Sequence, residues 1–194
     1  MKKTLFLLVV SFMMLSLNAQ EYVSTTPSNR SVLIEEFTGR NCGYCPDGHR
    51  IANQIAHDNP GRVWAINIHA GGFAPTSYPN LITDVSVTIH NGFGVTSYPS
   101  GVVNRSTPSA VGRNQWSNLS TSELQQISEV NIAGDCEIDY ANRTADITVE
   151  VYYTANSSES TNYLTVIMIQ DSIMGSQSGI SSHPEQIVNG QYCH

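Results

Sequence analysis

The sequence predicts an α/β domain followed by a small antiparallel, sandwich-like β domain. In the first part, two apolar runs of strand length, residues 31–37 and 63–68, flank a segment with helical spacing at residues 47–57. From residue 128 onward, three stretches alternate apolar and polar side chains, which is typical of an antiparallel sheet with one buried face. This change of pattern places the domain boundary between residues 127 and 128.

Turn-forming residues separate the elements of the first domain, residues 31–127. Asn-Pro-Gly at residues 59–61 ends the helix before the second strand, and residues 71–79 form a loop with two Gly and two Pro. Residues 81–91 fit either a helix or a strand, because three β-branched residues alternate there. Residues 116–127 have the spacing of a further helix.

The second domain, residues 128–194, consists of the three alternating stretches. They span residues 129–140, 145–154 and 163–170, and clusters rich in Asn, Ser and Thr separate them. Three or four strands make only a thin sandwich, because a sheet needs several strands to bury one face. We therefore expect this β domain to be incomplete at its C-terminus.

Composition excludes several functional classes. The chain has 194 residues, 16 acidic and 9 basic side chains and a formal net charge of −7, and its two lysines are Lys2 and Lys3. A chain with no lysine after residue 3 has no basic patch for phosphates, so nucleic acids and anionic membrane surfaces are disfavoured as partners. Only 13% of the residues are charged and 40% are hydrophobic, which excludes a disordered chain.

The N-terminus has the pattern of a secretory signal. Lys2 and Lys3 precede an apolar run at residues 4–17, and Leu-Asn-Ala follows as a small-residue cleavage site. We expect residues 1–19 to be a cleaved signal peptide and residues 20–30 to be a linker. The alternative is an uncleaved anchor, although the run is shorter than the roughly 20 residues that span a bilayer. Export permits disulfide bonds.

The chemistry of the sequence is concentrated in a Cys-Gly-Tyr-Cys motif. Cys42 and Cys45 follow a predicted strand and open a predicted helix, where free N–H groups and the helix dipole favour a thiolate. We expect Cys42 to be the exposed nucleophile, with a lowered pKa, and Cys45 to be the resolving thiol. Pro46 fits because it falls in the first helical turn.

Other roles for the cysteines remain open at this point. The pair could be a structural disulfide or half of a zinc site, but Cys136 and Cys193 are too far apart in sequence for a second zinc knuckle. Those two cysteines could also bridge within the β domain, or Cys193 could be free. His49 is expected on the helix surface, with a third metal ligand or a modulator of the Cys42 pKa as alternatives.

Three separated features resemble the thioredoxin superfamily over residues 31–127. The first is the order of strand, CGYC and helix, and the second is Glu36, six residues before Cys42. The third is the GVTSYPS stretch, where Pro99 is placed like the cis-proline of thioredoxins. Departures are the absence of Trp before Cys42, where Asn41 stands, and of a lysine to pair with Glu36.

The resemblance implies a disulfide between Cys42 and Cys45 and a catalytic role for both. It implies that Glu36 relays a proton for the resolving cysteine, with an ordinary buried strand carboxylate as the alternative. It also implies that Tyr98 and Pro99 position an extended substrate chain. No cofactor and no metal are implied.

A narrower resemblance extends over nearly the whole chain after the signal. The EEFTG-x-x-C-x-x-C-P opening, the Ile-Gln-Asp-Ser-Ile segment at residues 169–173 and the Gln-Tyr-x-His tail resemble the 28-kDa outer-membrane-protein-related family of Bacteroidetes-type bacteria. Those proteins combine a thioredoxin-like part with a β-sandwich part. In them the chain continues beyond the Tyr-x-His point, which agrees with a β domain that is incomplete here.

Together these features predict a protein of the periplasm or outer membrane that exchanges disulfides. Its expected partners are protein thiols or disulfides of the cell envelope, not nucleic acids, and an unknown partner would associate it with the outer membrane. The expected activity is that of a thiol–disulfide oxidoreductase. The alternative is an outer-membrane-associated binding or structural protein whose thioredoxin-like part is redox-inert.

Overall fold

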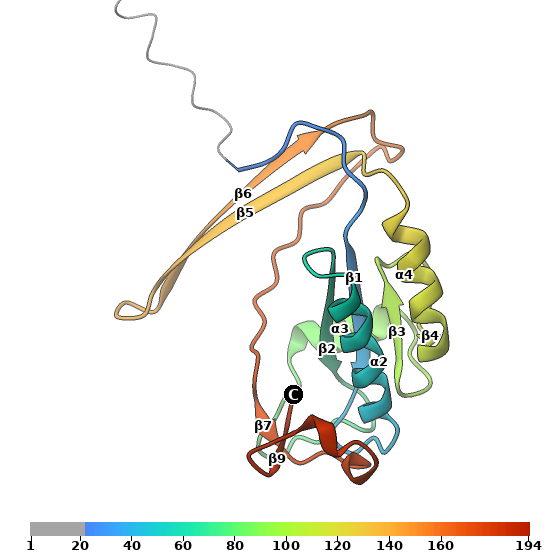
Figure 1. Ribbon diagram of the computed structural model, residues 1–194. Coiled ribbons are helices and arrows are strands. Elements are labelled where there is room, and N and C mark those ends of the chain that lie inside the picture. The colour runs from blue at the N-terminus through green and yellow to red at the C-terminus, as the bar shows by residue number, and fades with distance from the viewer. Residues whose placement is uncertain (1–21) are drawn as a thin grey trace, which may run out of the picture. The chain divides into compact units, whose positions relative to one another are not determined.

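The computed structural model describes residues 22–194, so the expected signal peptide at residues 1–19 lies outside the described residues. The described chain divides into two compact units (Figure 1). One contains residues 22–28 and 127–162, and the other contains residues 29–126 and 163–194. None of the helices within residues 22–194 is long and apolar enough to cross a membrane.

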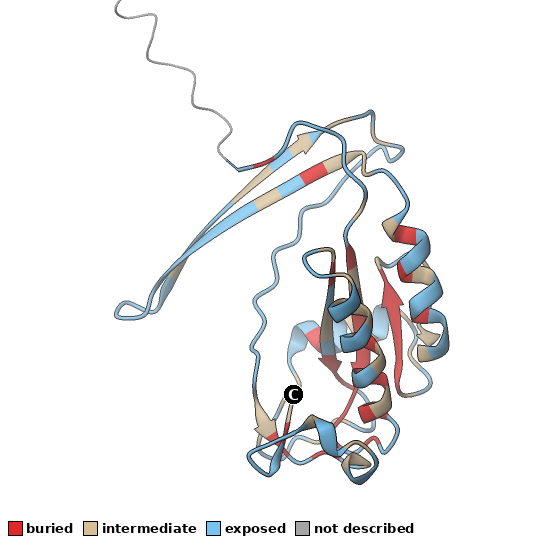
Figure 2. Cartoon of the chain, in the orientation of Figure 1, coloured by how far each residue is buried: buried red, intermediate tan, exposed pale blue. Residues whose placement is uncertain are grey.

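A four-stranded sheet forms the centre of the larger unit. Its order is β2 (Val63–His69), β1 (Val32–Thr38), β3 (Ser100–Val103) and β4 (Val111–Gly112). Strand β1 is parallel to β2 and antiparallel to β3, and β3 is antiparallel to β4. Strand β1 is buried along nearly its whole length (Figure 2), including its two glutamates, Glu35 and Glu36.

Helices cover both faces of this sheet. The side of β1 that carries Ile34 packs against α2 (Cys45–Asp58) and against Trp116 at the start of α4 (Trp116–Leu124). The opposite side carries Phe37, which forms a second apolar cluster with Ile68 and Val102; Ile89 of α3 (Asp84–Gly92) packs against it. The two expected strands and the helix between them are confirmed, with α2 beginning two residues earlier than predicted.

Residues 81–91, which fitted a helix or a strand, form a loop followed by α3. The choice is explained by Thr83, whose hydroxyl accepts a hydrogen bond from the Ser86 N–H at 3.0 Å. The Ser86 hydroxyl accepts the Thr83 N–H at 2.9 Å in return, so a capping box fixes the start of the helix.

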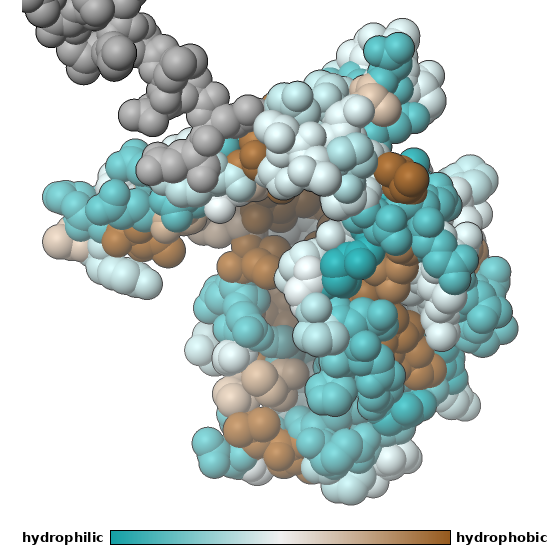
Figure 3. All heavy atoms as spheres, turned by 45° about the horizontal axis from the view of Figure 1, so that its top comes forward, coloured by the Kyte–Doolittle hydropathy of each residue, from teal (hydrophilic) through white to brown (hydrophobic). Residues whose placement is uncertain are grey.

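The smaller unit is a two-stranded antiparallel ribbon, β5 (Val130–Asp139) and β6 (Thr144–Tyr153). Its register places Ile132 opposite Val151 and Cys136 opposite Ile147, so one face is apolar. These side chains are exposed, and hydrophobic residues are visible on the molecular surface (Figure 3). Both strands occur where the alternating pattern predicted them.

The C-terminal part differs from the expected β-sandwich. Residues 163–170 form no strand, because their backbone has no neighbouring strand with which to form a ladder. The sheet after them is small, with the order β7 (Met174–Gly175), β9 (Gln191–Cys193) and β8 (Ile187–Val188). It belongs to the same unit as residues 29–126, whereas the sequence pattern grouped residues 163–194 with the ribbon.

Two short 3₁₀ helices, η2 (Ile180–Ser182) and η3 (Pro184–Gln186), connect β7 to β8. A third, η1 (Arg113–Gln115), directly precedes α4. We call residues 173–194 the C-terminal segment.

Replacement of Phe37 by Ala is expected to lower the free energy of unfolding by about 3–5 kcal/mol, because the fully buried ring would leave a cavity in the core. Urea titration followed by the fluorescence of the buried Trp116 would measure this change. Phe73→Ala is the control, since Phe73 is 45% exposed and should change stability by less than about 1 kcal/mol. Equal effects of the two variants would contradict this assignment of the core.

Candidate functional site

The Cys-Gly-Tyr-Cys motif lies in a turn between β1 and α2. Cys42 and Cys45 form a disulfide with a Cα–Cα distance of 5.4 Å, as the resemblance implied. The Cys42 N–H donates to the Gly39 carbonyl at 2.9 Å and closes the turn after the strand. Cys45 is the first helical residue and Pro46 follows it, where the absent proline N–H needs no helical acceptor.

Cys42 is buried, so the prediction that its side chain is exposed is wrong for this state. Its exposed fraction is 2%, and that of Cys45 is 0%. The reason is tertiary: residues of the C-terminal segment lie on the motif. The Gln177 side chain donates hydrogen bonds to the carbonyl oxygens of Cys42 at 2.8 Å and Gly39 at 3.3 Å.

Arg40 also binds the C-terminal segment. Its guanidinium donates to the Ser176 hydroxyl at 3.0 Å and to the Ser77 carbonyl at 2.7 Å. Its backbone carbonyl accepts the Ser178 N–H at 2.8 Å. Both backbone and side chain of Arg40 therefore bind the C-terminal segment.

Gly179 makes the closest approach to the motif. Its φ of +78° lies in the left-handed region. A Cβ atom built there would lie 2.7 Å from the Gly43 carbonyl carbon and still closer to its oxygen. Only glycine fits at this position without displacement of one of the two segments.

Glu36 is fully buried on the helix-covered face of β1. Within the described residues, neither of its carboxyl oxygens has a hydrogen-bond partner, and its Oε1 lies 3.5 Å from the His49 Nε2. Burial raises the pKa of Glu36 well above its usual value; Arg113 opposes this shift and Asp47 adds to it. Its neighbour Glu35, in contrast, faces the other way and binds Arg105 through both oxygens at 2.7 Å.

Pro99 lies beside Glu36, and both contact Gly48 in the first turns of α2. A Cβ atom added to Gly48 would lie 2.8 Å from the Pro99 Cβ and would also overlap the Glu36 carboxyl. The Tyr98–Pro99 peptide bond is cis, which confirms the prediction. Gly48 lies three residues after Cys45, so the two share one face of the helix.

Tyr98 is half-buried and directs its hydroxyl to His90 Nε2 at 2.5 Å. Its ring meets the Phe73 ring edge-on, with centroids 5.4 Å apart. Burial raises the pKa of the Tyr98 phenol. The structure thus brings Glu36 and Pro99 together at the start of α2, and places the Tyr98 side chain against α3.

His49 is buried rather than on the helix surface as predicted, because the C-terminal segment covers that side of α2. Its Nε2 lies 2.9 Å from the Thr38 hydroxyl, and its Nδ1 contacts the Tyr192 hydroxyl. Tyr192 donates to Gln186 Oε1 at 2.7 Å. Since a phenol has one proton, His49 Nδ1–H donates to Tyr192 and Thr38 donates to Nε2.

This series of hydrogen bonds ends at Pro46, the residue directly after the motif. The Gln186 amide donates to the Pro46 carbonyl at 2.8 Å, so the chain runs from β1 through α2 and the C-terminal segment back to α2. Every donor in it has an acceptor only while the His49 imidazole is neutral. Burial lowers the pKa of His49 to about 3, and His69 and His194 add to the shift.

Two further histidines lie beside this chain. The His69 and His194 rings meet edge-on with centroids 5.3 Å apart. Burial lowers the pKa of His69 to about 3 and that of His194 to about 4. Within residues 22–194, no three His, Cys, Asp or Glu side chains are placed to hold a metal ion.

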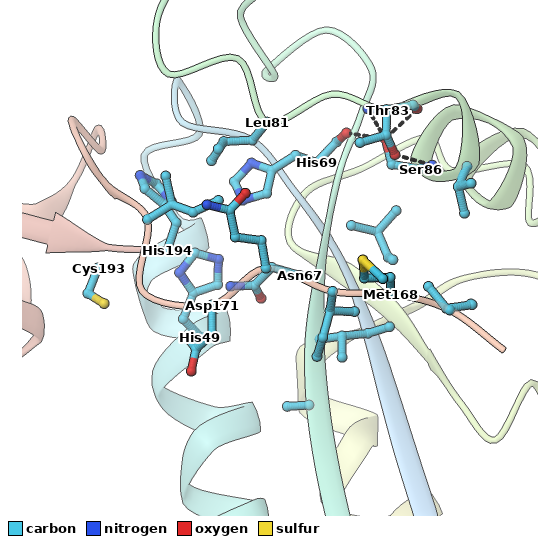
Figure 4. A pocket seen from close by; sticks show the side chains of 18 of the residues that line it. His49, Asn67, His69, Leu81, Thr83, Ser86, Met168, Asp171, Cys193 and His194 are labelled. Carbon is cyan, nitrogen blue, oxygen red and sulfur yellow. Dashed lines mark hydrogen bonds between the residues drawn. The ribbon is translucent and has the colours of Figure 1, made fainter. Parts of the chain in front are cut away.

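The three histidines lie at one end of a cavity of about 1130 Å³, and Met168 lies toward the other end (Figure 4). Strand β2, helix α3 and residues 165–171 supply most of its lining. Ile66, Ile68 and Leu81 make much of that lining apolar.

The other two cysteines are not paired with each other. Cys136 is an exposed free thiol in β5, and Cys193 is a partly buried free thiol in β9. The bridge between them that the sequence left open is therefore absent from this state.

Sequence reasoning missed Gln177 and Gly179 as residues that cover the motif, Arg40 as a residue that binds the C-terminal segment, and Tyr192 as the partner of His49. Their signal is weak, because more than 130 positions separate Gln177 from the carbonyl groups that it binds. The Gln-Tyr-x-His tail was noted only as part of a family resemblance. Its role in burying His49 depends on a contact across 143 positions.

Comparisons with known proteins point to one family. The sequence model of the family described as outer membrane protein Omp28 matches residues 86–194. None of the curated proteins matches the chain.

Two solved structures are similar at low identity. HBP35 of Porphyromonas gingivalis is 16% identical with a TM-score of 0.44, over 56% of this chain and 38% of that one. Protein AGR_C_4864 of Agrobacterium tumefaciens is 12% identical with a TM-score of 0.39, over 71% of this chain and 77% of that one. The present chain thus spans well under half the length of HBP35.

Tyr192→Phe is expected to destabilise the protein by about 1–3 kcal/mol, because it leaves the His49 Nδ1–H and Gln186 Oε1 without a partner. Urea titration would measure the change. Tyr163→Phe removes the same hydroxyl from a side chain that is 89% exposed and should have an effect below about 0.5 kcal/mol. A Tyr192 variant as stable as the Tyr163 variant would contradict the hydrogen-bond chain.

Acidification is expected to destabilise the protein through His49. Its pKa is about 3 when folded and about 6.5 when unfolded, so the unfolded state binds the proton first. The stability that the neutral ring contributes is therefore lost as pH falls from about 6.5 toward 3, by about 1.4 kcal/mol per pH unit. Glu36, whose pKa is raised, makes the opposite contribution to stability. Above about pH 4.5 its contribution to the free energy of unfolding increases as pH falls, because the folded state holds the proton more tightly than the unfolded state.

His49→Gln isolates the histidine, because Glu36, His69 and His194 are retained in the variant. The free energy of unfolding, measured by urea titration between pH 4 and 7, should depend on pH less steeply in the variant by about one proton. Parallel curves for the two proteins would show that His49 does not titrate as described.

Proposed function

The chain belongs to the outer membrane protein Omp28 family, and from this premise we propose that it is a thioredoxin-like envelope protein that exchanges disulfides with other polypeptides. Family membership associates it with the cell envelope. The observation that carries the proposal is the Cys42–Cys45 disulfide at the start of α2, a helix whose Gly48 lies against Pro99 and the unpaired carboxyl of Glu36.

The location of the motif supports a reactive thiolate in the reduced protein. Helix α2 has 14 residues, and its N-terminus presents free N–H groups and the positive end of the helix dipole. These groups stabilise a negative charge on Cys42, which lies just before the helix. A stabilised thiolate is both a better leaving group and a more abundant nucleophile at neutral pH.

The exchange with a partner dithiol proceeds in two balanced steps. A partner thiolate attacks the Cys42 sulfur, the Cys42–Cys45 bond breaks, and Cys45 leaves with the electron pair as a thiolate. The partner's second thiolate then attacks the partner sulfur of the mixed disulfide, and Cys42 leaves as a thiolate. Two electrons pass to the motif, the partner becomes a disulfide, and the reverse sequence oxidises the motif again.

Glu36 is suited to exchange a proton with Cys45. It contacts Gly48, one helical turn after Cys45 on the same face. Its raised pKa favours a neutral carboxyl that gives a proton to the leaving Cys45 thiolate and takes it back in the reverse step. An unpaired buried carboxyl is costly to keep, whereas Glu35 beside it is fully paired, so a functional role is the better account of Glu36.

The proposed partners are polypeptides of the periplasm or the outer membrane, positioned through Tyr98 and Pro99. Nucleic acids are not among them, since the formal net charge is −7. The electrons come from the partner's thiols, so the reaction needs no cofactor.

The burial of both sulfurs favours a second candidate function. A disulfide that is 2% and 0% exposed could be structural in a binding protein of the envelope. Structural disulfides have reduction potentials below about −300 mV, whereas working oxidoreductases lie between about −270 and −120 mV. The equilibrium potential therefore separates the two functions.

An equilibrium redox titration, trapped by alkylation and read by mass spectrometry, is expected to show a two-electron transition of the motif between about −270 and −120 mV. Cys136→Ser should leave this transition unchanged, because Cys136 is a free thiol in the other unit. Cys42→Ser should abolish it. A motif that stays oxidised throughout this range would favour the structural role.

A further inference from the structure

In the state described here, the disulfide is almost inaccessible to solvent, since Cys42 is 2% exposed and Cys45 is 0% exposed. Thiol–disulfide exchange requires an incoming thiolate to reach a sulfur atom, so its rate depends on access. Both cysteines of the motif are buried, and the stretch Ser176–Gly179 lies directly on it through the Gln177 amide and Gly179. Exchange therefore requires this stretch to leave.

The stretch is held by hydrogen bonds to backbone carbonyl groups of the turn before Cys45, and by the Arg40 guanidinium, which donates to the Ser176 hydroxyl at 3.0 Å. The Ser178 N–H donates to the Arg40 carbonyl at 2.8 Å. The Gln177 amide, which is chemically like a peptide amide, donates to the carbonyls of Gly39 and Cys42. The carbonyl groups of Gly39, Arg40 and Cys42 thus accept hydrogen bonds from the stretch, and the N–H groups of another polypeptide could donate to the same oxygens.

We propose that the surface formed by residues 39–43 is a polypeptide-binding site, that residues 176–179 are its internal occupant, and that a segment of a partner chain replaces them before exchange. This inference rests on the function proposed above and assigns a recognition surface to it. The occupant shows which partner the surface fits: a polypeptide segment that donates amide N–H groups to backbone carbonyls, as Gln177 and Ser178 do, and carries small residues beside its cysteine. Gly179 against Gly43 sets that size limit.

The anchoring of the occupant is compatible with its release. The sheet that holds it has strands of only two, two and three residues. Ile187 and Val188 in β8 are 40% and 45% exposed, and residues 163–170 before the segment form no strand. Regions with short ladders and little apolar burial open at a lower free energy than the core.

Gly179→Ala tests the proposal, because the added methyl group would overlap Gly43 and push the stretch off the motif. The measured quantity is the rate at which dithiothreitol reduces the Cys42–Cys45 disulfide, trapped by alkylation. Gly61→Ala is the matched control: its φ of +70° carries similar backbone strain, but nothing lies within 4 Å of the new Cβ. We expect reduction to be faster by about tenfold or more in the Gly179 variant, and unchanged in the control.

A second variant guards against simple misfolding. Gln177→Ala removes the bonds to Gly39 and Cys42 without adding bulk, and is expected to accelerate reduction several-fold. It should also increase hydrogen–deuterium exchange in peptides that cover residues 173–182, while the fluorescence of the buried Trp116 stays native. Reduction rates of both variants equal to those of the wild type and the Gly61 control would overturn the proposal.

The test is independent of the proposed function. Occupancy of the surface is read from a rate, whereas redox competence is read from an equilibrium potential. Suppose that the Gly179 variant is reduced faster but the potential of the motif lies below about −300 mV. The internal occupant would then be supported, the disulfide would be structural, and the exchange function would be rejected. If the potential lies in the working range and the reduction rates are unchanged, the exchange function would be supported and the internal occupant would be rejected.

Discussion

The burial of β1 is the constraint on which the rest of the larger unit depends. This strand pairs with β2 on one side and β3 on the other, and helices cover both its faces. Because β1 is paired along its whole length with β2 and over residues 34–37 with β3, the position of its end at Thr38 is fixed, and the turn that follows places Cys42 and Cys45 at the start of α2. The same strand fixes Glu36 on the α2 side and Glu35 on the α3 side.

The two adjacent glutamates of β1 differ in their surroundings because they lie on opposite faces of the strand. Side chains alternate across a strand, so one glutamate must face each layer. Glu35 reaches Arg105 and forms a two-pronged ion pair, which satisfies its charge. Glu36 reaches apolar and helical neighbours, and its carboxyl stays unpaired with a raised pKa, beside Gly48 and Pro99.

The C-terminal segment adds polar contacts to this frame rather than a large apolar core. It completes the hydrogen-bond chain of Thr38, His49, Tyr192 and Gln186, and it binds the motif through Gln177 and Arg40. Polar contacts of this kind are individually worth little but costly to leave unmade. They close the site well while they hold, and an arriving polypeptide can offer equivalent hydrogen bonds in exchange.

The sequence by itself determined the local features of this protein. Apolar runs placed β1 and β2, helical spacing placed α2, alternation placed β5 and β6, and the order of strand, CGYC and helix placed the two cysteines at a helix start. All of these depend on residues that are close together in the chain, where periodicity is visible. The Cys42–Cys45 disulfide and the cis bond before Pro99 were expected from the resemblance to the thioredoxin superfamily, and the structure contains both.

Only the tertiary structure decided the environment of the site. It buried Cys42 and His49, placed Gln177 beside the motif, and placed Tyr192 beside His49, each across more than 130 positions of the chain. It also left residues 163–170 without a strand partner and moved the C-terminal segment to the unit that contains the motif. Strand pairing, burial and pKa values depend on which distant segments meet, and single-sequence periodicity carries no record of those contacts.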